Sequence, residues 1–488
     1  MIEFFEKINW VPYGAFLIDL LIRVGLSVRV IKRRLPVGVS LAWLSVVLVL
    51  PYVGAVLYLL VGEYRLGPKR ARRSLLYKQS RSTIVEKSDG YKIDPEALPP
   101  EAAAIARLAC TTLGAPVLGG NRLQLLENAE AAFPVLIADI DQAKRSCFLE
   151  FYIWSNGGVA DKVGEALIRA AKRGVKCLVL VDAMGSKGFL RSHQATEMRQ
   201  NGVRVEAAME AGMLRLLLVR PDLRMHRKIG LIDGQFGYTG SLNLADPLYF
   251  KKEAGVGQWV DALARIEGPA VNELAETFRE DWYLETGDLI EDDLLHNKQQ
   301  GDRLPGKATV QVLPTGPDEH VEAIEQIVLM ALYGAKREVV LTTPYFVPSE
   351  SLLTALLSAA SRGVSVTLIV PAKVESKLVK FASRANQTDL LKSGIQVAQF
   401  KGGLLHTKSI TIDGTISLFG SLNLDPRSFR LDLEITLGIY DAEFTSSLRR
   451  LQQVYLDKSD FLDLPTCKAR SSLELLAEDT TRLVGPLL

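Results

Sequence analysis

A short polar motif occurs twice in this chain, and the spacing within it is the same in both copies. The first copy consists of His226, Lys228, Asp233, Ser241 and Asn243. The second copy has the same residue types 180 positions later, namely His406, Lys408, Asp413, Ser421 and Asn423. Because the polar residues keep their register while the residues between them vary, the sequence predicts one fold unit that is used twice.

Each copy of the motif predicts a strand, a turn and a returning strand. Side chains two positions apart on an extended chain share one face, so each His lies beside its Lys. Asp-Gly then turns the chain, and the next apolar run returns as an antiparallel neighbour that brings Gly-Ser-Leu-Asn close to both. Imidazole, ammonium, hydroxyl and amide groups together suit a phosphate. A single copy is equally readable as a polar hairpin, but two copies in register, using two of five histidines, argue against that reading.

The double motif resembles the signature of the phospholipase D superfamily, and longer stretches narrow the resemblance to bacterial cardiolipin synthases. These stretches are residues 239–261, residues 420–430 and the end of the N-terminal apolar region, residues 61–67. The resemblance covers nearly the whole chain. One departure is Asp432, which stands where the resemblance leads us to expect Asn before Glu434.

The order of expected elements indicates an α/β fold. Strands and helices alternate in each half, which predicts two phospholipase D-like α/β sandwich repeats related by a pseudo-two-fold axis. The expected strands are 148–154, 175–181, 339–343 and 364–370, and the expected helices are 159–172, 190–200, 351–360 and 377–392. The first half carries extra residues around 213–221, which form either a loop that touches lipid or an ordinary core strand.

We expect five segments along the chain. They are a two-helix transmembrane hairpin (1–65), a basic and polar connector (66–115), a first phospholipase D-like domain (116–285), a linker (286–305) and a second phospholipase D-like domain (306–488).

The expected membrane spans cover about residues 10–28 and 38–62. The first contains Asp19 and Arg23, which lie one helical turn apart and partly neutralise each other. Residues 37–62 contain no charged residue, and about 20 apolar residues suffice to cross a bilayer. A signal peptide is the alternative for the first span, but no small-residue cleavage site follows it, so a retained hairpin is favoured. Basic flanks favour a cytoplasmic body at a bacterial inner membrane, while basic residues between the spans favour the opposite side.

Charge is distributed unevenly along the chain. The net charge is +2, but residues 1–81 hold 13 Lys and Arg against 4 Asp and Glu. We therefore expect the N-terminal region to lie against anionic lipid and the slightly acidic remainder to bind no nucleic acid. The four cysteines, Cys110, Cys147, Cys177 and Cys467, have no metal-binding or redox spacing and are expected to be reduced.

The paired motifs predict a two-step transfer at a phosphodiester. A neutral imidazole can attack phosphorus to form a covalent phospho-histidine, which divides one difficult displacement into two easier ones. A second imidazole can protonate the leaving oxygen and then deprotonate the incoming alcohol. The Lys, Asn and Ser side chains of both motifs would hold the non-bridging oxygens, where charge develops. This chemistry requires no metal and no cofactor.

The resemblance implies roles for individual residues. It makes His226 the nucleophile and His406 the general acid and base. Glu434, and by analogy Glu253, would fix the tautomer of a histidine. Asp233 and Asp413 belong to the signature, but they lie at the turn, where orienting the loop and taking part in the reaction are both open. Glu150, Tyr152 and Tyr345 stand at strand ends, where they either contact substrate or, as the favoured reading, pack there.

The resemblance also implies a function. A membrane phosphatidyltransferase would take one phosphatidylglycerol as a phosphatidyl-histidine, release glycerol and transfer the phosphatidyl group to a second phosphatidylglycerol, making cardiolipin. Its partners would be phosphatidylglycerol and anionic membrane lipid, and a homodimer would raise membrane avidity although one chain holds both motifs. The alternatives are a hydrolase of the same superfamily, a transferase with another alcohol acceptor, and a membrane scaffold with a relict site.

Overall fold

The computed structural model describes residues 10–35, 37–63, 65–81, 90–210, 220, 222–296, 305–317 and 321–484. The chain forms two compact units. The N-terminal unit comprises Met1–Ala71 and Ala211–Leu223, and the large unit comprises Arg72–Glu210 and Arg224–Leu488. The extra residues expected around 213–221 lie outside the described residues, apart from Arg220.

Three helices form the described part of the N-terminal unit: α2 (Trp10–Lys32), α3 (Val37–Val49) and α4 (Pro51–Val61). They enclose a small core of Val30, Trp43, Val47 and Tyr58. The rings of Trp43 and Tyr58 meet edge to face with centroids 5.3 Å apart. Most other apolar side chains of these helices face outward, because so small a core cannot enclose them.

The predicted transmembrane hairpin is not confirmed. Residues 38–62, expected as one span, form two helices that meet at Leu50, because Pro51 has no N–H to continue the hydrogen-bond ladder of α3. Among the helices that the structure describes, none is both long enough and apolar enough to span a membrane.

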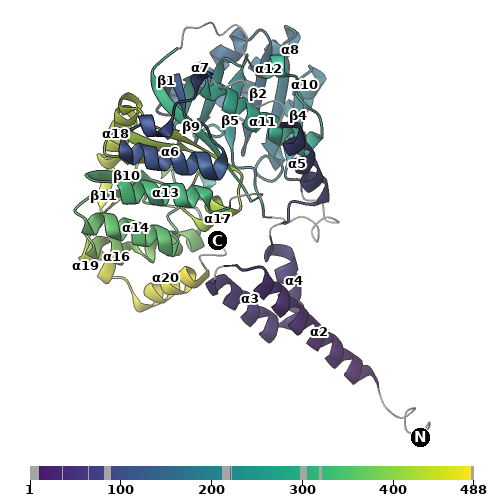
Figure 1. Ribbon diagram of the computed structural model, residues 1–488, viewed down its shortest axis with the longest axis vertical. Coiled ribbons are helices and arrows are strands. Elements are labelled where there is room, and N and C mark those ends of the chain that lie inside the picture. Colours follow the sequence, from purple (N-terminus) through teal and green to yellow (C-terminus); the bar gives the residue numbers. More distant parts are fainter. Residues whose placement is uncertain are drawn as a thin grey trace. The chain divides into compact units, whose positions relative to one another are not determined.

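A single 15-stranded sheet runs through the large unit (Figure 1). Its centre is the antiparallel pair of β1 (Leu118–Leu126) and β9 (Ala308–Thr315). From β1 outward the strands are β8 (Leu263–Glu267), β6 (Phe236–Gly240), β5 (Lys228–Ile232), β2 (Ser146–Phe151), β3 (Lys176–Asp182) and β4 (Arg204–Ala208). From β9 outward they are β16 (Glu434–Ile439), β15 (Ile416–Gly420), β14 (Ser409–Ile412), β10 (Glu338–Thr342), β11 (Ser365–Pro371), β12 (Gln396–Phe400) and β17 (Ser459–Phe461). Apart from β17, the two series match strand for strand, as two repeats related by a two-fold axis require.

Helices alternate with the strands along both halves of the chain. Those before the linker are α5 (Pro68–Arg81), α6 (Pro100–Leu113), α7 (Ala129–Gln142), α8 (Val159–Lys172), α9 (Lys187–Leu190), α10 (His193–Gln200), α11 (Ala270–Thr286) and α12 (Asp292–Leu295). Those after it are α13 (Ala323–Gly334), α14 (Glu350–Ser361), α15 (Lys377–Arg384), α16 (Gln387–Lys392), α17 (Pro426–Arg430), α18 (Ala442–Leu456), α19 (Leu464–Lys468) and α20 (Ser472–Val484).

The helix expected at 159–172 is confirmed, but two expected helices are interrupted. The helix expected at 190–200 is divided into α9 and α10, because the hydroxyl of Ser192 caps a new helix by accepting from the N–H of Ala195. The helix expected at 377–392 is likewise divided into α15 and α16.

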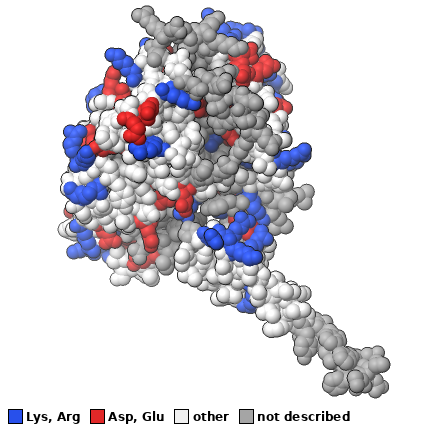
Figure 2. Space-filling view, in the orientation of Figure 1, with Lys and Arg blue, Asp and Glu red and all other residues white. Residues whose placement is uncertain are grey.

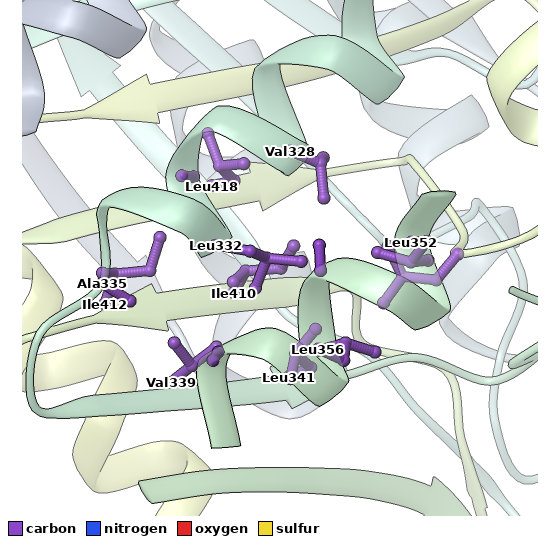
Figure 3. Close-up of a cluster of buried hydrophobic side chains, with 14 of the residues drawn as sticks. Val328, Leu332, Ala335, Val339, Leu341, Leu352, Leu356, Ile410, Ile412 and Leu418 are labelled. Carbon is purple, nitrogen blue, oxygen red and sulfur yellow. The ribbon is translucent and has the colours of Figure 1, made fainter. Parts of the chain in front are cut away.

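Each half has its own apolar core, which sets the position of its motif strand. In the second half, Leu332 of α13 and Leu356 of α14 pack over Leu341 of β10 and Ile410 of β14 (Figure 3). Burial of each such side chain stabilises the fold by roughly 1.5–3 kcal/mol. The position of β14, and hence of Lys408 just before it, therefore depends on this core.

Surface charge on the large unit is mixed in sign. On the face drawn in Figure 2, basic and acidic side chains alternate over the unit without forming one broad patch of either sign.

Candidate active site

The sheet brings both copies of the motif to one buried site. His226 and Lys228 lie at the start of β5, and His406 and Lys408 just before β14. All four side chains are buried. The two motifs are close enough that Lys408 lowers the pKa of His226 and Lys228 lowers that of His406. The predicted convergence of imidazole and ammonium groups is therefore observed in the structure.

Backbone pairing between the halves holds each histidine in place. The N–H of His226 donates to the carbonyl of Leu433 at 2.9 Å, and the N–H of His406 donates to the carbonyl of Val260 at 2.8 Å. The second contact extends a short parallel pair, β7 (Trp259–Val260) with β13 (Leu404–Leu405). Each histidine is therefore anchored to the half of the chain that does not carry it.

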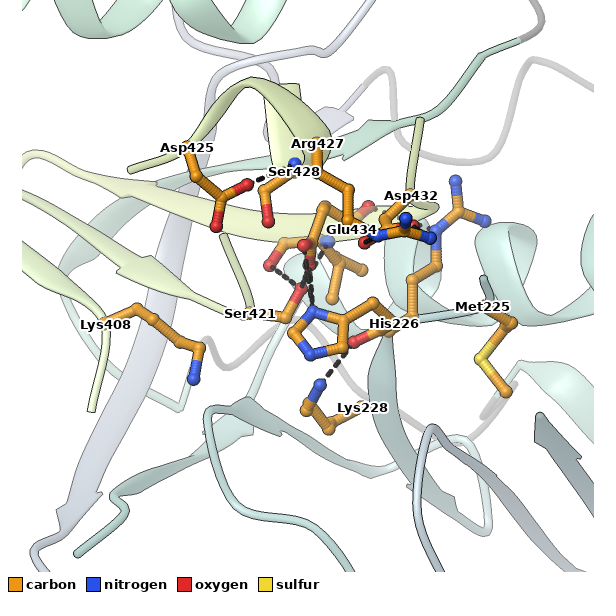
Figure 4. Close-up of polar contacts among 12 residues, drawn as sticks. Met225, His226, Lys228, Lys408, Ser421, Asp425, Arg427, Ser428, Asp432 and Glu434 are labelled. Atoms are coloured by element: carbon orange, nitrogen blue, oxygen red, sulfur yellow. Dashed lines mark hydrogen bonds and ion pairs between the residues drawn. The ribbon is translucent and has the colours of Figure 1, made fainter. Parts of the chain in front are cut away.

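Each histidine is also bonded to a carboxylate from the opposite half of the chain. Nδ1 of His226 lies 2.8 and 2.9 Å from the two carboxylate oxygens of Glu434 (Figure 4). Nδ1 of His406 lies 2.6 Å from Oδ1 of Asp261. With Nδ1 donating to a carboxylate, Nε2 is the ring nitrogen that each histidine can present to a substrate.

The structure corrects the expectation for Glu253, because Asp261 is the counterpart of Glu434. Glu253 is exposed on a short 3₁₀ helix, Lys252–Ala254. Strand register explains the difference: Leu263 pairs with Gly240 of the first motif and Thr436 with Gly420 of the second, and each acid lies two residues earlier. Counting from the motif glycines to the paired strand was the signal that could have identified Asp261.

The two motif serines support these carboxylates. Ser421 donates a hydrogen bond to Glu434, and its oxygen accepts from the N–H of Ile435 at 2.9 Å. Ser241 accepts from the N–H of Ala262 at 3.0 Å and donates to its carbonyl at 3.3 Å, and it helps to lower the pKa of the neighbouring Asp261. The serines thus occupy a layer behind the imidazoles, whereas the sequence predicted that they would hold phosphate.

The lysines keep part of their hydrogen-bonding capacity for a ligand. Lys228 Nζ donates to the carbonyl of His226 at 2.5 Å, and Lys408 Nζ donates to the carbonyl of His406 at 2.6 Å. An ammonium has three donors, so each lysine can serve further acceptors. Burial lowers the pKa of Lys228 to about 8 and holds the pKa of Lys408 well below its usual range.

Burial also shifts the pKa values of the two histidines and of the acids bonded to them. Desolvation, aided by Lys228, holds the pKa of His226 well below its usual range, and desolvation lowers the pKa of His406 to about 3. Both imidazoles are therefore neutral in the free site. The acids differ. Burial raises the pKa of Glu434 to about 7. For Asp261, burial is the largest single effect, but the combined effects of His406, Lys408 and Ser241 outweigh it and lower the pKa.

The motif asparagines line the same site. Oδ1 of Asn243 accepts from the N–H of Ile153 at 3.2 Å, and its Nδ2 is buried without a partner among the described residues. An unpaired buried amide donor is costly, so a ligand oxygen that accepts from it would be favoured.

Asp233 and Asp413 lie at the far end of the motif strands. The carboxylate of Asp233 accepts from the N–H groups of Lys144, Arg145 and Ser146 at 2.7 to 2.9 Å. Asp413 holds residues 336–338 in the same way. Five residues at about 3.3 Å each place these carboxylates roughly 16 Å from the motif lysines. Of the two roles left open by the sequence, the geometry favours the structural one, in which each carboxylate orients the turn.

Comparison with known proteins finds similarity along the whole chain, including both halves that carry the motifs. Residues 136–282 and 328–454 match the family described as cardiolipin synthase, PLD-like domain, and residues 21–63 match the phospholipase D-nuclease N-terminal family. The chain is 40% identical to cardiolipin synthase A of Klebsiella pneumoniae and 40% identical to that of Edwardsiella ictaluri, with 100% of each chain covered. The chain belongs to the cardiolipin synthase family. The fold also resembles a phosphatidylserine synthase from Haemophilus influenzae, with a TM-score of 0.57 and 14% identity over 79% of this chain and 100% of that one.

In this member of the cardiolipin synthase family, aromatic rings flank both histidines. The ring of Tyr152 lies 4.9 Å from that of His226, and Lys228 Nζ lies 5.5 Å from the Tyr152 centroid. Trp259, which the sequence did not single out as a site residue, lies 4.4 Å from His406. Of the strand-end residues, Tyr152 and Tyr345 are half-buried and Glu150 is fully buried. Tyr152 therefore lies beside the reacting groups as well as packing at its strand end.

The departure from the cardiolipin synthase pattern at residue 432 has a local partner. Arg427 donates to both carboxylate oxygens of Asp432 at 3.2 Å. Burial nevertheless raises the pKa of Asp432 well above its usual range. Asp432 therefore adds an acidic group near Glu434.

Proposed function

We propose that this chain is a phosphatidyltransferase that makes cardiolipin and glycerol from two molecules of phosphatidylglycerol. The observation that carries the proposal is the pair of buried imidazoles in one site, each bonded through Nδ1 to a carboxylate from the opposite half. Identity of about 40% to cardiolipin synthase A over the whole chain supports the choice of substrate.

In the first step, Nε2 of His226 attacks the phosphorus of one phosphatidylglycerol. The bond from phosphorus to the glycerol oxygen breaks, and that oxygen takes a proton from His406. The phosphate charge and ionised Asp261 favour a protonated His406 once substrate is bound, although the free imidazole is neutral. Glu434, with its raised pKa, favours imidazolium less, which suits a neutral nucleophile at His226.

In the second step, the terminal hydroxyl of another phosphatidylglycerol gives its proton to His406. Its oxygen attacks phosphorus, and the bond from phosphorus to His226 breaks. Lys228, Lys408 and Asn243 can donate to the non-bridging oxygens in both steps, where transition-state charge develops.

The N-terminal unit supports attachment to a membrane. Its helices expose many large apolar side chains, among them Phe16, Leu21, Val37, Val49 and Val53, each more than half exposed. Exposed apolar surface of this extent marks a membrane or protein contact, and we propose a bacterial membrane. Retention of the full-length protein in the membrane fraction after an alkaline carbonate wash would support this, and release into the wash would refute it.

The decisive assay uses purified protein in phosphatidylglycerol liposomes, with lipid products identified by mass spectrometry. Wild-type protein should form cardiolipin and free glycerol, while His226→Ala and His406→Ala should form neither. Phosphatidic acid as the sole product would move the assignment to hydrolysis. Absence of product with any common phospholipid would indicate a scaffold.

A further inference from the structure

A continuous wall joins the active site to the outer surface beside His406. The ring of Trp259 lies against His406, and the ring of Phe250 lies 4.9 Å from that of Trp259. Lys251 pairs with Glu375 at 3.1 Å, and its Nζ lies 5.3 Å from the Trp259 ring. The loop of residues 246–252 from the first half therefore meets residues 373–380 of the second half at the edge of the site.

The outer side of this wall exposes apolar and basic side chains together. Leu248 and Tyr249 are 53% and 64% exposed, and Leu378 is 42% exposed. Lys252 is exposed in the same loop as Leu248 and Tyr249, and Lys377 is exposed beside Leu378 at the start of α15. The contact of Lys251 with Glu375 joins these two segments. We call these five residues, Leu248, Tyr249, Lys252, Lys377 and Leu378, the basic-apolar rim.

The structure holds the first half of the rim in this exposed arrangement. The carboxylate of Asp246 accepts from the N–H groups of Val159 and Leu248, both at 2.8 Å, which fixes the loop to the start of α8. Phe250 turns inward against Trp259 while its neighbours Leu248 and Tyr249 face outward. Because the loop is anchored at both places, collapse of these two side chains into the core is prevented.

The apolar surface continues beyond α15. Helix α20 packs against α15 and exposes Leu473 and Leu476, which are 79% and 63% exposed. Arg470, which precedes α20, binds Glu478 at 2.9 Å and Gln387 of α16, so α20 is fastened to the large unit. The helix that carries Leu378 is therefore packed against a second helix that also exposes apolar side chains.

We propose that the basic-apolar rim docks the large unit on an anionic bilayer. Exposed leucine and tyrosine beside lysine are the combination that enters the interface of such a bilayer, where apolar groups insert and ammonium groups pair with lipid phosphates. A water-soluble partner would not require this mixture at the edge of a site for lipid. The inference rests on the proposed function in one respect, namely that the substrate of the adjacent site lies in that bilayer.

Hydrogen exchange tests the docking directly. Full-length protein is placed in nanodiscs of phosphatidylcholine alone and in nanodiscs that are about half phosphatidylglycerol. Residues 246–252 and 377–380 should be protected only in the anionic discs, and the double variant Lys252→Glu/Lys377→Glu should lose that protection. The charge-preserving variant Lys252→Arg/Lys377→Arg should keep it. Equal exchange in both kinds of disc would overturn the proposal.

Activity gives a second, independent readout. Each surface lysine contributes about fivefold to binding of an anionic membrane, so loss of both lysines alone accounts for roughly 25-fold. The double Glu variant also adds two negative charges, so it should lose at least that factor in kcat/KM on phosphatidylglycerol vesicles. Its activity on monomeric dihexanoyl-phosphatidylglycerol should stay within about twofold of wild type. The double variant Leu248→Gln/Tyr249→Gln should likewise lose activity on vesicles and keep it on the monomeric substrate. Tyr333→Gln, an exposed control on α13, should change neither activity.

The possible outcomes distinguish failure of the docking proposal from failure of the proposed function. Unchanged activity of the rim variants on vesicles, or an equal loss on monomeric substrate, would overturn membrane docking by the rim. Inactivity of the wild-type protein on both substrates would instead contradict the proposed function. In that case, the hydrogen-exchange result would still decide the docking proposal: protection of the rim only in anionic nanodiscs would support it, and equal exchange in both kinds of disc would overturn it.

Discussion

Asp261 binds His406 at 2.6 Å across the boundary between the halves, although 145 positions separate the two residues in the chain. Glu434 binds His226 in the opposite direction. Neither half therefore contains an imidazole together with the carboxylate that orients it, and each repeat needs the other to complete its own histidine.

Neutralising Asp261 should impair catalysis while leaving the fold intact. Asp261→Asn removes the charge that favours a protonated His406, so we expect kcat on phosphatidylglycerol vesicles to fall by about 10²–10⁴, the range of general acid-base catalysis. The matched control is Glu253→Gln, which alters an exposed acid of the same half and should retain wild-type kcat. An unchanged kcat for Asp261→Asn would exclude a role for the carboxylate in proton transfer.

A phosphatidyl-histidine should accumulate on His226 when His406, the general acid, is removed and the leaving group requires no proton. A phosphatidyl ester of p-nitrophenol leaves without protonation, so His406→Ala should form the covalent intermediate from it and resolve it slowly. Rapid acid-free quenching and mass spectrometry of peptides should locate the adduct at His226. No adduct is expected with His226→Ala, and an adduct at any other residue would contradict the assigned nucleophile.

Glu434 should make the protein less stable as pH rises. Its pKa is raised from 4.5 to about 7, so between these values the folded state binds more protons than the unfolded state and stability falls with rising pH. The full effect is about 3 kcal/mol at 1.36 kcal/mol per pKa unit. Glu434→Gln cannot ionise, so its melting temperature relative to wild type should rise between pH 5 and pH 8. A constant difference over that range would show that Glu434 titrates normally.

Asp413 should matter for stability more than for chemistry. Asp413→Ala leaves three backbone N–H groups without their acceptor. Because two of these hydrogen bonds are exposed to solvent and the third is only partly buried, water can replace part of each contact, and each lost bond should cost about 0.5–1.5 kcal/mol. Thermal unfolding should show a clear drop in melting temperature, whereas Asp457→Asn, an exposed site, should change it little. If the folded Asp413→Ala protein at low temperature were as inactive as His406→Ala, Asp413 would take part in the reaction after all.

The repeated motif and its local geometry could be predicted because they depend on neighbours in the chain. His226 and Lys228 share a strand face by the two-residue period alone, and α8 follows from a helical apolar pattern that continues through Gly164. Asp261 could not be identified in that way, because its partner His406 belongs to the other repeat. The register of β8 against β6 gives the position of Asp261 within its own half, and the pairing of β7 with β13 between the halves brings it to His406.

In the N-terminal region, a local feature also escaped prediction from the sequence. A run of apolar residues indicates burial in some apolar environment, but it does not determine where a helix ends. Pro51 divides the expected second span, and the hydropathy of residues 37–62 contains no trace of that division because Pro51 lies within the apolar run.

The shared sheet also has a consequence for shape. Six strands, β6, β8, β1, β9, β16 and β15, lie between the two motif strands β5 and β14. At about 4.8 Å per strand, a flat sheet would hold the two motifs roughly 34 Å apart, yet His226 and His406 are each bonded to the opposite half. The sheet must therefore curl back on itself between β5 and β14, and the degree of this curvature sets the distance between the two motifs across the active site.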